Sequence, residues 1–161
     1  QEEDRRSWQQ TQDVSLTQDT ELQRYAEEIL VGSIMVPIVG CQHYRGVAHV
    51  GEYVHLVREP RNPYDRNAIR VDNMQGSQVG YIKRNFAECF QAVMDDQSAL
   101  ALHVEAHIPS SPTSRFQMTG QVSFYGLANS PALQLLHAQM ARHGLRLQPV
   151  GNQQQSQRGG A

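Results

Sequence analysis

The 161-residue sequence has a length typical of one domain with flanking segments. Its formal net charge of −2 is unevenly distributed, because residues 1–30 hold eight acidic and three basic residues while the remainder carries a small positive excess. That excess excludes a long electrostatic track along a duplex but permits contact with a few phosphates. No window is apolar enough to cross a membrane. The two cysteines, Cys41 and Cys89, form no C-x-x-C pattern, which argues against a disulfide scaffold and fits a reducing compartment.

Composition divides the chain into three parts. Residues 1–30 are polar and acidic and are expected to form a mostly disordered leader, although the spacing of apolar residues favours a short helix over Thr20–Leu30. Residues 31–148 carry the patterns of a folded domain. Residues 149–161 are rich in Gln and Gly and are expected to form a disordered linker. We expect the chain to be a fragment that continues into a larger protein.

The folded part is predicted to consist mainly of strands. Alternating or β-branched apolar runs predict six of them, at Ser33–Val39, Glu52–Arg58, Asn67–Asp72, Gln78–Lys83, Leu100–Ile108 and Phe116–Phe124. Helical spacing predicts two helices, one over Asn85–Asp95 and one beginning at Ser130 with Pro131 in its first position. No βαβ alternation occurs. The predicted fold is therefore mainly β, a small six-stranded β-barrel with two flanking α-helices.

The sequence shows no pattern for catalysis, a metal or a cofactor. His103 and His107 point the same way on a predicted strand, but about 13 Å separates them at the rise of a strand. No H-E-x-x-H, G-x-S-x-G or glycine-rich phosphate loop is present. Asp65, Asp72 and Glu88 could be imagined as nuclease ligands, but nothing in their spacing makes them converge. We therefore expect a binding domain that is not an enzyme and holds no metal or cofactor.

One segment, residues 58–71, stands out. Pro60 and Pro63 predict a rigid loop between two strands, on which Tyr64 and Asp65 lie close to arginines. An aromatic ring, a carboxylate and guanidinium groups are the parts of a nucleotide site. A plainer interpretation is that Asn62 and Asp65 only stabilise a turn. The residues alone leave both interpretations open.

The sequence Asn-Pro-Tyr-Asp-Arg-Asn-Ala-Ile-Arg-Val at 62–71, followed by Gln-Val-Gly-Tyr-Ile at 78–82 and a predicted helix, resembles the HIRAN domain of Swi/Snf-type ATPases. The segment Val-Gly-Cys-Gln-His-Tyr-Arg-Gly at 39–46 is similar to the first loop of that family. The resemblance covers roughly residues 31–147.

This resemblance implies an OB-like barrel that captures the 3′-hydroxyl end of single-stranded DNA. It assigns Asp65 to the terminal hydroxyl, and Tyr64 and Phe116 to stacking on nucleotides. Asn62 matches the loop asparagine and Arg84 a basic position near phosphates. The residues implied to contact DNA are Gln42, His43, Tyr44, Arg45, Arg61, Asn62, Tyr64, Asp65, Tyr81, Arg84 and Phe116.

The chain departs from the family pattern in the first loop, in the hairpin and at Arg61. Gln42 and His43 stand where the family has Arg-Tyr, Tyr81 replaces a histidine, and Arg61 replaces a loop asparagine. Losing the family's arginine removes a charge-assisted phosphate bond, which Arg45 or Arg61 could restore from a neighbouring position. These departures bear on affinity and end preference rather than on the fold.

The resemblance further implies a nuclear, monomeric module joined to the remainder of an ATPase that remodels stalled replication forks, without a membrane partner. The alternative is a protein-interaction barrel in which Tyr64, Tyr81 and Phe116 form an apolar groove for a peptide. Competition separates the two, because an oligonucleotide with a free 3′ end should displace nothing from a pure peptide site.

Overall fold

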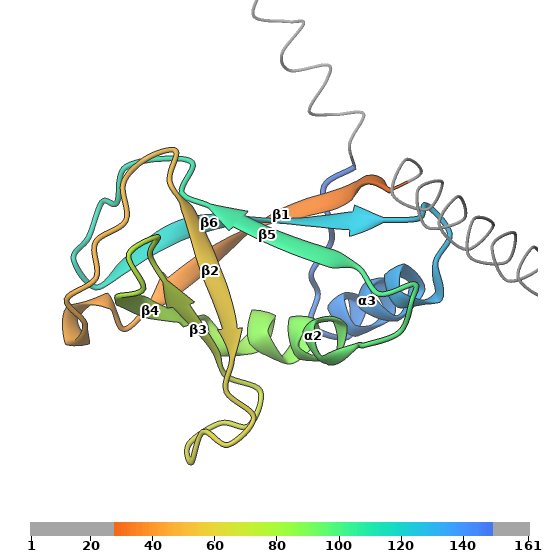
Figure 1. Ribbon diagram of the computed structural model, residues 1–161, viewed down its shortest axis with the longest axis horizontal. Coiled ribbons are helices and arrows are strands. Elements are labelled where there is room, and N and C mark those ends of the chain that lie inside the picture. The colour runs from red at the N-terminus through yellow and green to blue at the C-terminus, as the bar shows by residue number, and fades with distance from the viewer. Residues whose placement is uncertain (1–27, 150–161) are drawn as a thin grey trace, which may run out of the picture.

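Six antiparallel strands close into a barrel in the order β1-β4-β3-β2-β5-β6 (Figure 1). The structure is a computed structural model and describes residues 28–149. The strands are β1 (Ile29–Val39), β2 (Tyr53–Arg58), β3 (Ile69–Asp72), β4 (Gln78–Ile82), β5 (His103–His107) and β6 (Gln117–Gly126). The predicted six-stranded, mainly β barrel is confirmed.

The longest strand, β1, joins the two halves of the barrel. Its whole length pairs with β6, from Ile29 opposite Gly126 to Val39 opposite Gln117. Its last two residues also pair with β4, where Val39 lies opposite Tyr81. Because of this double pairing, the C-terminal end of β1 lies at the end of the barrel where the loop after β2 begins. Several loops therefore lie close together at that end.

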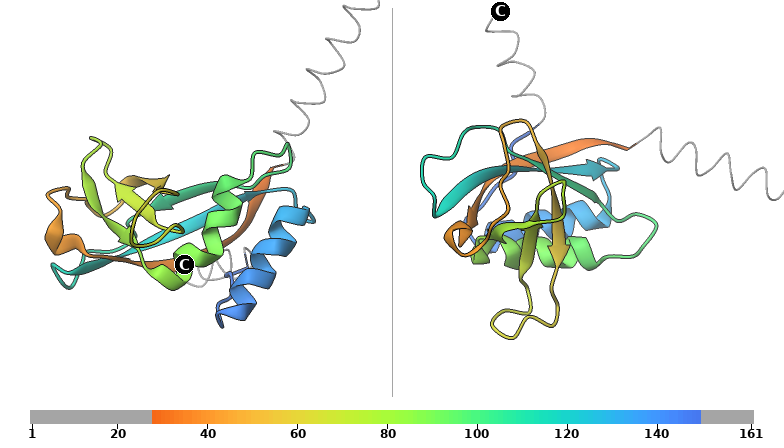
Figure 2. Two further views of the ribbon diagram at one scale, coloured as in Figure 1. Left: turned by 90° about the horizontal axis from the view of Figure 1, so that it is seen from below. Right: turned by 60° about the vertical axis from the view of Figure 1, so that its left-hand side comes forward.

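Two helices lie together on one side of the barrel (Figures 1 and 2): α2 (Arg84–Asp95) and α3 (Pro131–Arg142). The side chain of Ser130 caps α3 by accepting a hydrogen bond of 3.2 Å from the Leu133 amide, and Pro131 occupies a first-turn position that needs no donor. Gly144 follows α3 with φ of 68°, a left-handed conformation suited to glycine after a helix. These signals in the sequence placed α3 correctly.

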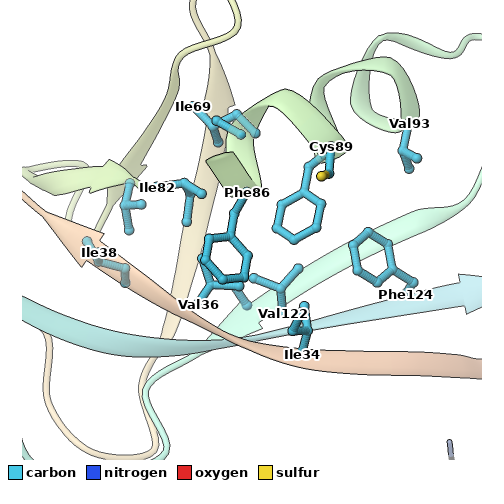
Figure 3. Packing of buried hydrophobic residues seen from close by; sticks show 14 of the residues in the cluster. Ile34, Val36, Ile38, Ile69, Ile82, Phe86, Cys89, Val93, Val122 and Phe124 are labelled. Carbon is cyan, nitrogen blue, oxygen red and sulfur yellow. The ribbon is translucent and has the colours of Figure 1, made fainter. Parts of the chain in front are cut away.

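The core lies between α2 and the barrel wall. Phe86, Cys89 and Val93 of α2 point towards strand residues such as Val36 and Val122 (Figure 3). The rings of Phe90 and Phe124 pack edge to face at 5.3 Å, and both are fully buried. Burial of this apolar face against the sheet fixes α2, whose first turn lies next to the candidate site described below.

Most predicted boundaries differ from the structure by one to four residues; β1, for example, begins at Ile29 rather than at Ser33. Leu100 lies in a turn after α2, so the strand predicted from Leu100 begins only at His103. The strand predicted from Phe116 begins at Gln117. The helix predicted over Thr20–Leu30 falls mostly outside the described residues, and its last two residues belong to β1, because they pair with Tyr125 and Gly126.

The predicted leader and linker lie almost entirely outside the described residues. Between residues 28 and 149, no helix has the length and apolar character of a membrane span.

Candidate functional site

The loop of residues 59–68 projects from the barrel between β2 and β3 (Figures 1 and 2). Arg58, at the end of β2, fixes its base by donating to the carbonyls of Ala68 at 2.8 Å and Arg66 at 3.0 Å. The same guanidinium forms a bidentate pair with Asp95 of α2 at 3.0 and 3.1 Å. The Arg58 side chain is 11% exposed and that of Asp95 is 47% exposed, so the bidentate geometry rather than burial of the pair holds the loop against the helix.

The tip of the loop is a hydrogen-bonded turn. The side-chain oxygen of Asn62 accepts from the amides of Tyr64 at 2.9 Å and Asp65 at 3.1 Å. One oxygen of Asp65 accepts from the Asn67 amide at 2.9 Å. These are the turn-stabilising bonds of the plainer interpretation. They also leave the Tyr64 ring 90% exposed and the second Asp65 oxygen facing Arg84, so the turn presents the parts of a nucleotide site.

A cleft of about 790 Å³ lies between this loop and the barrel. Seven of the eleven residues predicted to contact DNA line it: Tyr44, Arg61, Asn62, Tyr64, Asp65, Tyr81 and Arg84. They come from three stretches that are distant in sequence, namely the first loop, the projecting loop, and β4 with the start of α2, which follows it directly. The fold therefore assembles most of the predicted site in one place.

Among the cleft residues that the sequence analysis did not assign to the site, Glu59 is the one that carries a charge. Glu59 begins the projecting loop, and one of its oxygens accepts from the Tyr81 hydroxyl at 2.7 Å and from the Asn62 side-chain amide at 3.0 Å. Its other oxygen accepts from Arg70 at 3.1 Å, and Arg70 also forms a bidentate pair with Asp72 at 3.0 and 3.1 Å. Glu59 thus connects the loop, β4 and β3 through a single carboxylate.

This network changes the ionisation of its members. Burial opposes the charge of Glu59, but hydrogen bonds from Tyr81, Asn62 and Arg70 outweigh it and lower the pKa of the carboxyl below its usual value. Burial, together with the bond to the Glu59 carboxylate, raises the pKa of Tyr81 to about 12. At neutral pH, Glu59 is therefore an acceptor and Tyr81 a donor, and their hydrogen bond is charge-assisted.

Cationic groups lie at the rim of the cleft. Arg84 is 72% exposed, and its Nε lies 3.8 Å from Asp65 and 3.9 Å from Glu88. At these distances and this exposure the pairs contribute little to stability, so the guanidinium can turn towards an anion without large loss. Arg61 is also exposed on the loop. The site consequently offers an acceptor carboxylate next to donors for phosphate.

The other four predicted residues, Gln42, His43, Arg45 and Phe116, lie outside the cleft. Gln42 and His43 belong to the short 3₁₀ helix η1 (Cys41–His43), and both are exposed. The carbonyl of Phe116 accepts from the Cys41 amide at 3.1 Å, which places Phe116 next to η1. The 51% exposed ring of Phe116 has the Arg115 guanidinium 5.1 Å from its centroid.

Tyr44 links these residues to the cleft. Its ring lies 6.4 Å from that of His43 and 5.9 Å from that of Tyr81, both in edge-to-face geometry. The approach of β1 and η1 to β4 depends on Gly80, because a Cβ there would lie 2.6 Å from the Val39 carbonyl oxygen of β1 and 3.2 Å from the Cys41 Sγ of η1. The glycine of the Gln-Val-Gly-Tyr-Ile motif is thus explained by packing. Phe116 and η1 form a second platform next to the cleft rather than a wall of it.

Within residues 28–149, no three His, Cys, Asp or Glu side chains are grouped so that they could hold a metal ion. His103 and His107 both lie on β5. The three carboxylates considered as nuclease ligands do not form one group. Asp72 is paired with Arg70 in β3, whereas Asp65 and Glu88 both lie near Arg84.

The HIRAN domain model matches residues 31–126 of the chain. The chain belongs to the HIRAN family. It is 37% identical over 135 residues to helicase-like transcription factor of Oryctolagus cuniculus, an alignment that covers 84% of this chain and 12% of that protein. The chain therefore spans about an eighth of the length of this curated relative.

Solved HIRAN structures agree with the fold. The crystal structure of the HIRAN domain of human HLTF is similar with a TM-score of 0.69 at 34% identity, covering 77% of this chain and 98% of that chain. The NMR structure of the HLTF HIRAN domain in its DNA-bound conformation gives a TM-score of 0.62 at 34% identity, covering 76% and 96%. The predicted family and barrel are both confirmed.

Proposed function

We propose that this HIRAN domain binds single-stranded DNA and captures its free 3′-hydroxyl end in the cleft between the projecting loop and the barrel. The observation that carries the proposal is the convergence of an exposed ring, a carboxylate and exposed arginines on one cleft. The similarity to a HIRAN domain whose structure was solved in a DNA-bound conformation supports the choice of ligand.

Each group in the cleft has a role that follows from its chemistry. The Tyr64 ring is exposed and its backbone amide is held by Asn62, so a terminal base can stack on the ring. The second oxygen of Asp65, which faces Arg84, can accept a hydrogen bond from the terminal hydroxyl. Arg84 and Arg61 can donate to the preceding phosphates. Phe116 and His43, on the neighbouring platform, provide surfaces for a second nucleotide.

End selectivity follows from the Asp65 carboxylate. A strand that continues beyond the site, or that ends in a phosphate, places a negative charge next to this carboxylate, and the two charges repel each other. A hydroxyl end forms a hydrogen bond instead. A longer oligonucleotide with a free 3′-hydroxyl should therefore bind little more tightly than a short one, whereas an oligonucleotide with a blocked 3′ end should bind more weakly.

The wider role rests on the relatives. As part of a Swi/Snf-type ATPase, the domain would act in the nucleus as a monomeric, non-catalytic module that brings the ATPase to the 3′ end exposed at a stalled replication fork. The names of the relatives support this assignment, since they are helicase-like transcription factors and a SWI/SNF-related regulator of chromatin.

Fluorescence anisotropy with a short oligothymidine labelled at its 5′ end tests the proposal. We expect the 3′-hydroxyl form to bind more tightly than the 3′-phosphate form, and the unlabelled 3′-hydroxyl form to compete. Equal affinity for the two ends would refute end capture, and no binding would refute the DNA site.

The peptide-binding alternative is less well supported. Addition of a peptide strand requires an open sheet edge, and the six described strands close on one another. Of the three aromatic residues proposed for the groove, Tyr64 and Tyr81 line the cleft and Phe116 does not.

A further inference from the structure

We propose that Glu59 is the positioning and specificity-determining residue of the cleft. It fixes the walls that present Tyr64 and Asp65, and its charge adds to that of Asp65 in excluding a terminal phosphate. This inference rests on the proposed function and extends it to a residue that does not itself contact the hydroxyl.

The first step concerns the loop. Glu59 accepts a hydrogen bond of 3.0 Å from the Asn62 side-chain nitrogen. That bond turns the Asn62 oxygen towards the amides of Tyr64 and Asp65, which it holds at 2.9 and 3.1 Å. The orientation of the amide group is thus set jointly by the carboxylate and the two backbone amides. A flipped amide would place its oxygen against the Glu59 carboxylate and its N–H groups against two backbone donors.

The second step concerns the opposite wall. The same Glu59 oxygen accepts from the Tyr81 hydroxyl at 2.7 Å. The Tyr81 ring packs edge to face against Tyr44 at 5.9 Å, so the position of one ring limits the other. One carboxylate oxygen therefore sets the spacing between the loop and the barrel. Because the Tyr81 proton is committed to Glu59, Tyr81 orients the cleft rather than donating to a phosphate.

The third step concerns charge. Arg70 is the cation closest to Glu59, but it is shared with Asp72, through one bond to Glu59 and two to Asp72. Two carboxylates thus share one guanidinium, and Glu59 is the member of this group that lines the cleft. Only 23% of the Glu59 side chain is exposed, so solvent screens its charge incompletely. A phosphate that takes the place of the terminal hydroxyl is repelled by Glu59 as well as by Asp65.

Glu59→Gln is the sharpest perturbation. A glutamine has the same shape but replaces one acceptor oxygen by a donor. Whichever way its amide is turned, an N–H group faces either the Tyr81 and Asn62 donors or the Arg70 donor. The variant therefore loses either the bond from Arg70 or the bonds from Tyr81 and Asn62, and it removes the charge without opening a cavity.

A matched control is Glu52→Gln. Glu52 also accepts two hydrogen bonds from a neighbouring loop, from the amides of His49 at 2.8 Å and Met74 at 3.4 Å. It precedes β2 whereas Glu59 follows β2, so the two lie roughly 20 Å apart at the rise of a strand. It lines none of the cleft.

The experiment measures dissociation constants for 3′-hydroxyl and 3′-phosphate oligothymidine with the wild-type domain and both variants. We expect Glu59→Gln to weaken 3′-hydroxyl binding about tenfold, the loss typical of a charge-assisted hydrogen bond. We also expect it to lower the ratio of affinities for the two ends. Glu52→Gln should leave both values within about twofold of wild type, inside the range of ordinary surface substitutions. An unchanged ratio for Glu59→Gln, or an equal change for Glu52→Gln, would overturn the inference.

Tyr81→Phe keeps the inference testable if Glu59→Gln fails to fold, because it removes only one hydroxyl. We expect it to weaken binding less than Glu59→Gln, and the two effects to be non-additive in the double variant because they act through one bond. Wild-type affinity in Tyr81→Phe, or full additivity, would count against positioning.

The amide NMR signals of Tyr64 and Asp65 in the DNA-free domain separate this inference from the proposed function. They should shift in Glu59→Gln and not in Glu52→Gln, whether or not DNA binds. If the wild type binds no DNA, the proposed function fails while these signals still test positioning. If the wild type prefers the hydroxyl end and Glu59→Gln does so equally, the inference alone fails.

Discussion

Replacing Asp65 by asparagine tests the proposed end selectivity most directly. The substitution keeps the shape and the oxygen that accepts from the Asn67 amide at 2.9 Å, so the turn should persist. It removes the negative charge next to the terminal position. We therefore expect Asp65→Asn to affect the discrimination between 3′-hydroxyl and 3′-phosphate ends more than the affinity for the hydroxyl end.

The magnitude follows from the geometry. A terminal phosphate that replaces the hydroxyl would place its charge about 4 Å from the carboxylate, which costs about 1 kcal/mol in water and about 4 kcal/mol near a protein surface. With 21% of the Asp65 side chain exposed, the site lies between these limits. The wild-type domain should thus prefer the hydroxyl end by roughly fivefold or more. In Asp65→Asn the preference for the hydroxyl end should fall, and the part that remains should come from the repulsion between Glu59 and a terminal phosphate.

Asp96→Asn provides a matched control. Asp96 accepts from the amide two residues ahead, that of Ser98, at 2.9 Å, which is the same local arrangement as Asp65 with Asn67, and it lies outside the cleft. Titration of both oligonucleotides against the three proteins gives the ratios. An end preference that Asp65→Asn leaves intact, or that Asp96→Asn reduces equally, would refute the assigned role.

Three further predictions concern stacking, phosphate contact and ionisation. Tyr64→Ala and Phe116→Ala should each weaken binding by about 1–3 kcal/mol if each ring stacks on a base. Because both residues are exposed, the melting temperature should hardly change, and a parallel loss of stability would indicate a packing role. Gln42→Arg should strengthen binding and steepen the slope of log affinity against log salt by ~0.7, whereas an arginine at Gln155 should not; equal effects would mean that the first loop makes no phosphate contact. The pKa of Glu59 is lowered in the folded state, so its ionisation stabilises the fold at pH values above the ordinary pKa of 4.5, and this stabilisation is lost as the pH falls through the folded pKa. The melting temperatures of wild type and Glu59→Gln should therefore converge in acid. A difference that stays constant with pH would contradict the network.

Local patterns in the sequence determine much of this fold. The alternation through β2 and β6 and the start of α3 at Ser130 and Pro131 each reflect interactions between residues near in sequence, and these elements were predicted within a few residues. The errors arose where neighbours in space decided the outcome. Leu100 fits the alternation of β5 but lies in a turn that follows α2, and the pairing of Ile29 with Gly126 overrides helical spacing.

The site shows the same division. The residues at the tip of the loop were found because the turn and the family motif are contiguous in sequence. Glu59 was missed because its importance comes from Tyr81, which is 22 positions away, and from Arg70 on another strand. The one local signal was the spacing of Glu59 and Asn62, three residues apart around Pro60. Sequence alone could not show that Phe116 lies beside η1 rather than in the cleft.

The arrangement of the loop favours the proposed binding of a flexible strand end by a small cleft. Association costs free energy for every group that becomes ordered. The loop is ordered before any ligand binds, by the hydrogen bonds of Asn62, by those that Arg58 donates to the base of the loop, and by the Glu59 network. Pro60 and Pro63 further restrict the backbone angles of the loop. The Tyr64 ring therefore remains exposed in the free domain without its backbone being free to move, and the entropy lost on binding falls mainly on the DNA. A variant that loosens the loop should lower affinity through a slower association or a faster dissociation even when every contacting side chain is still present.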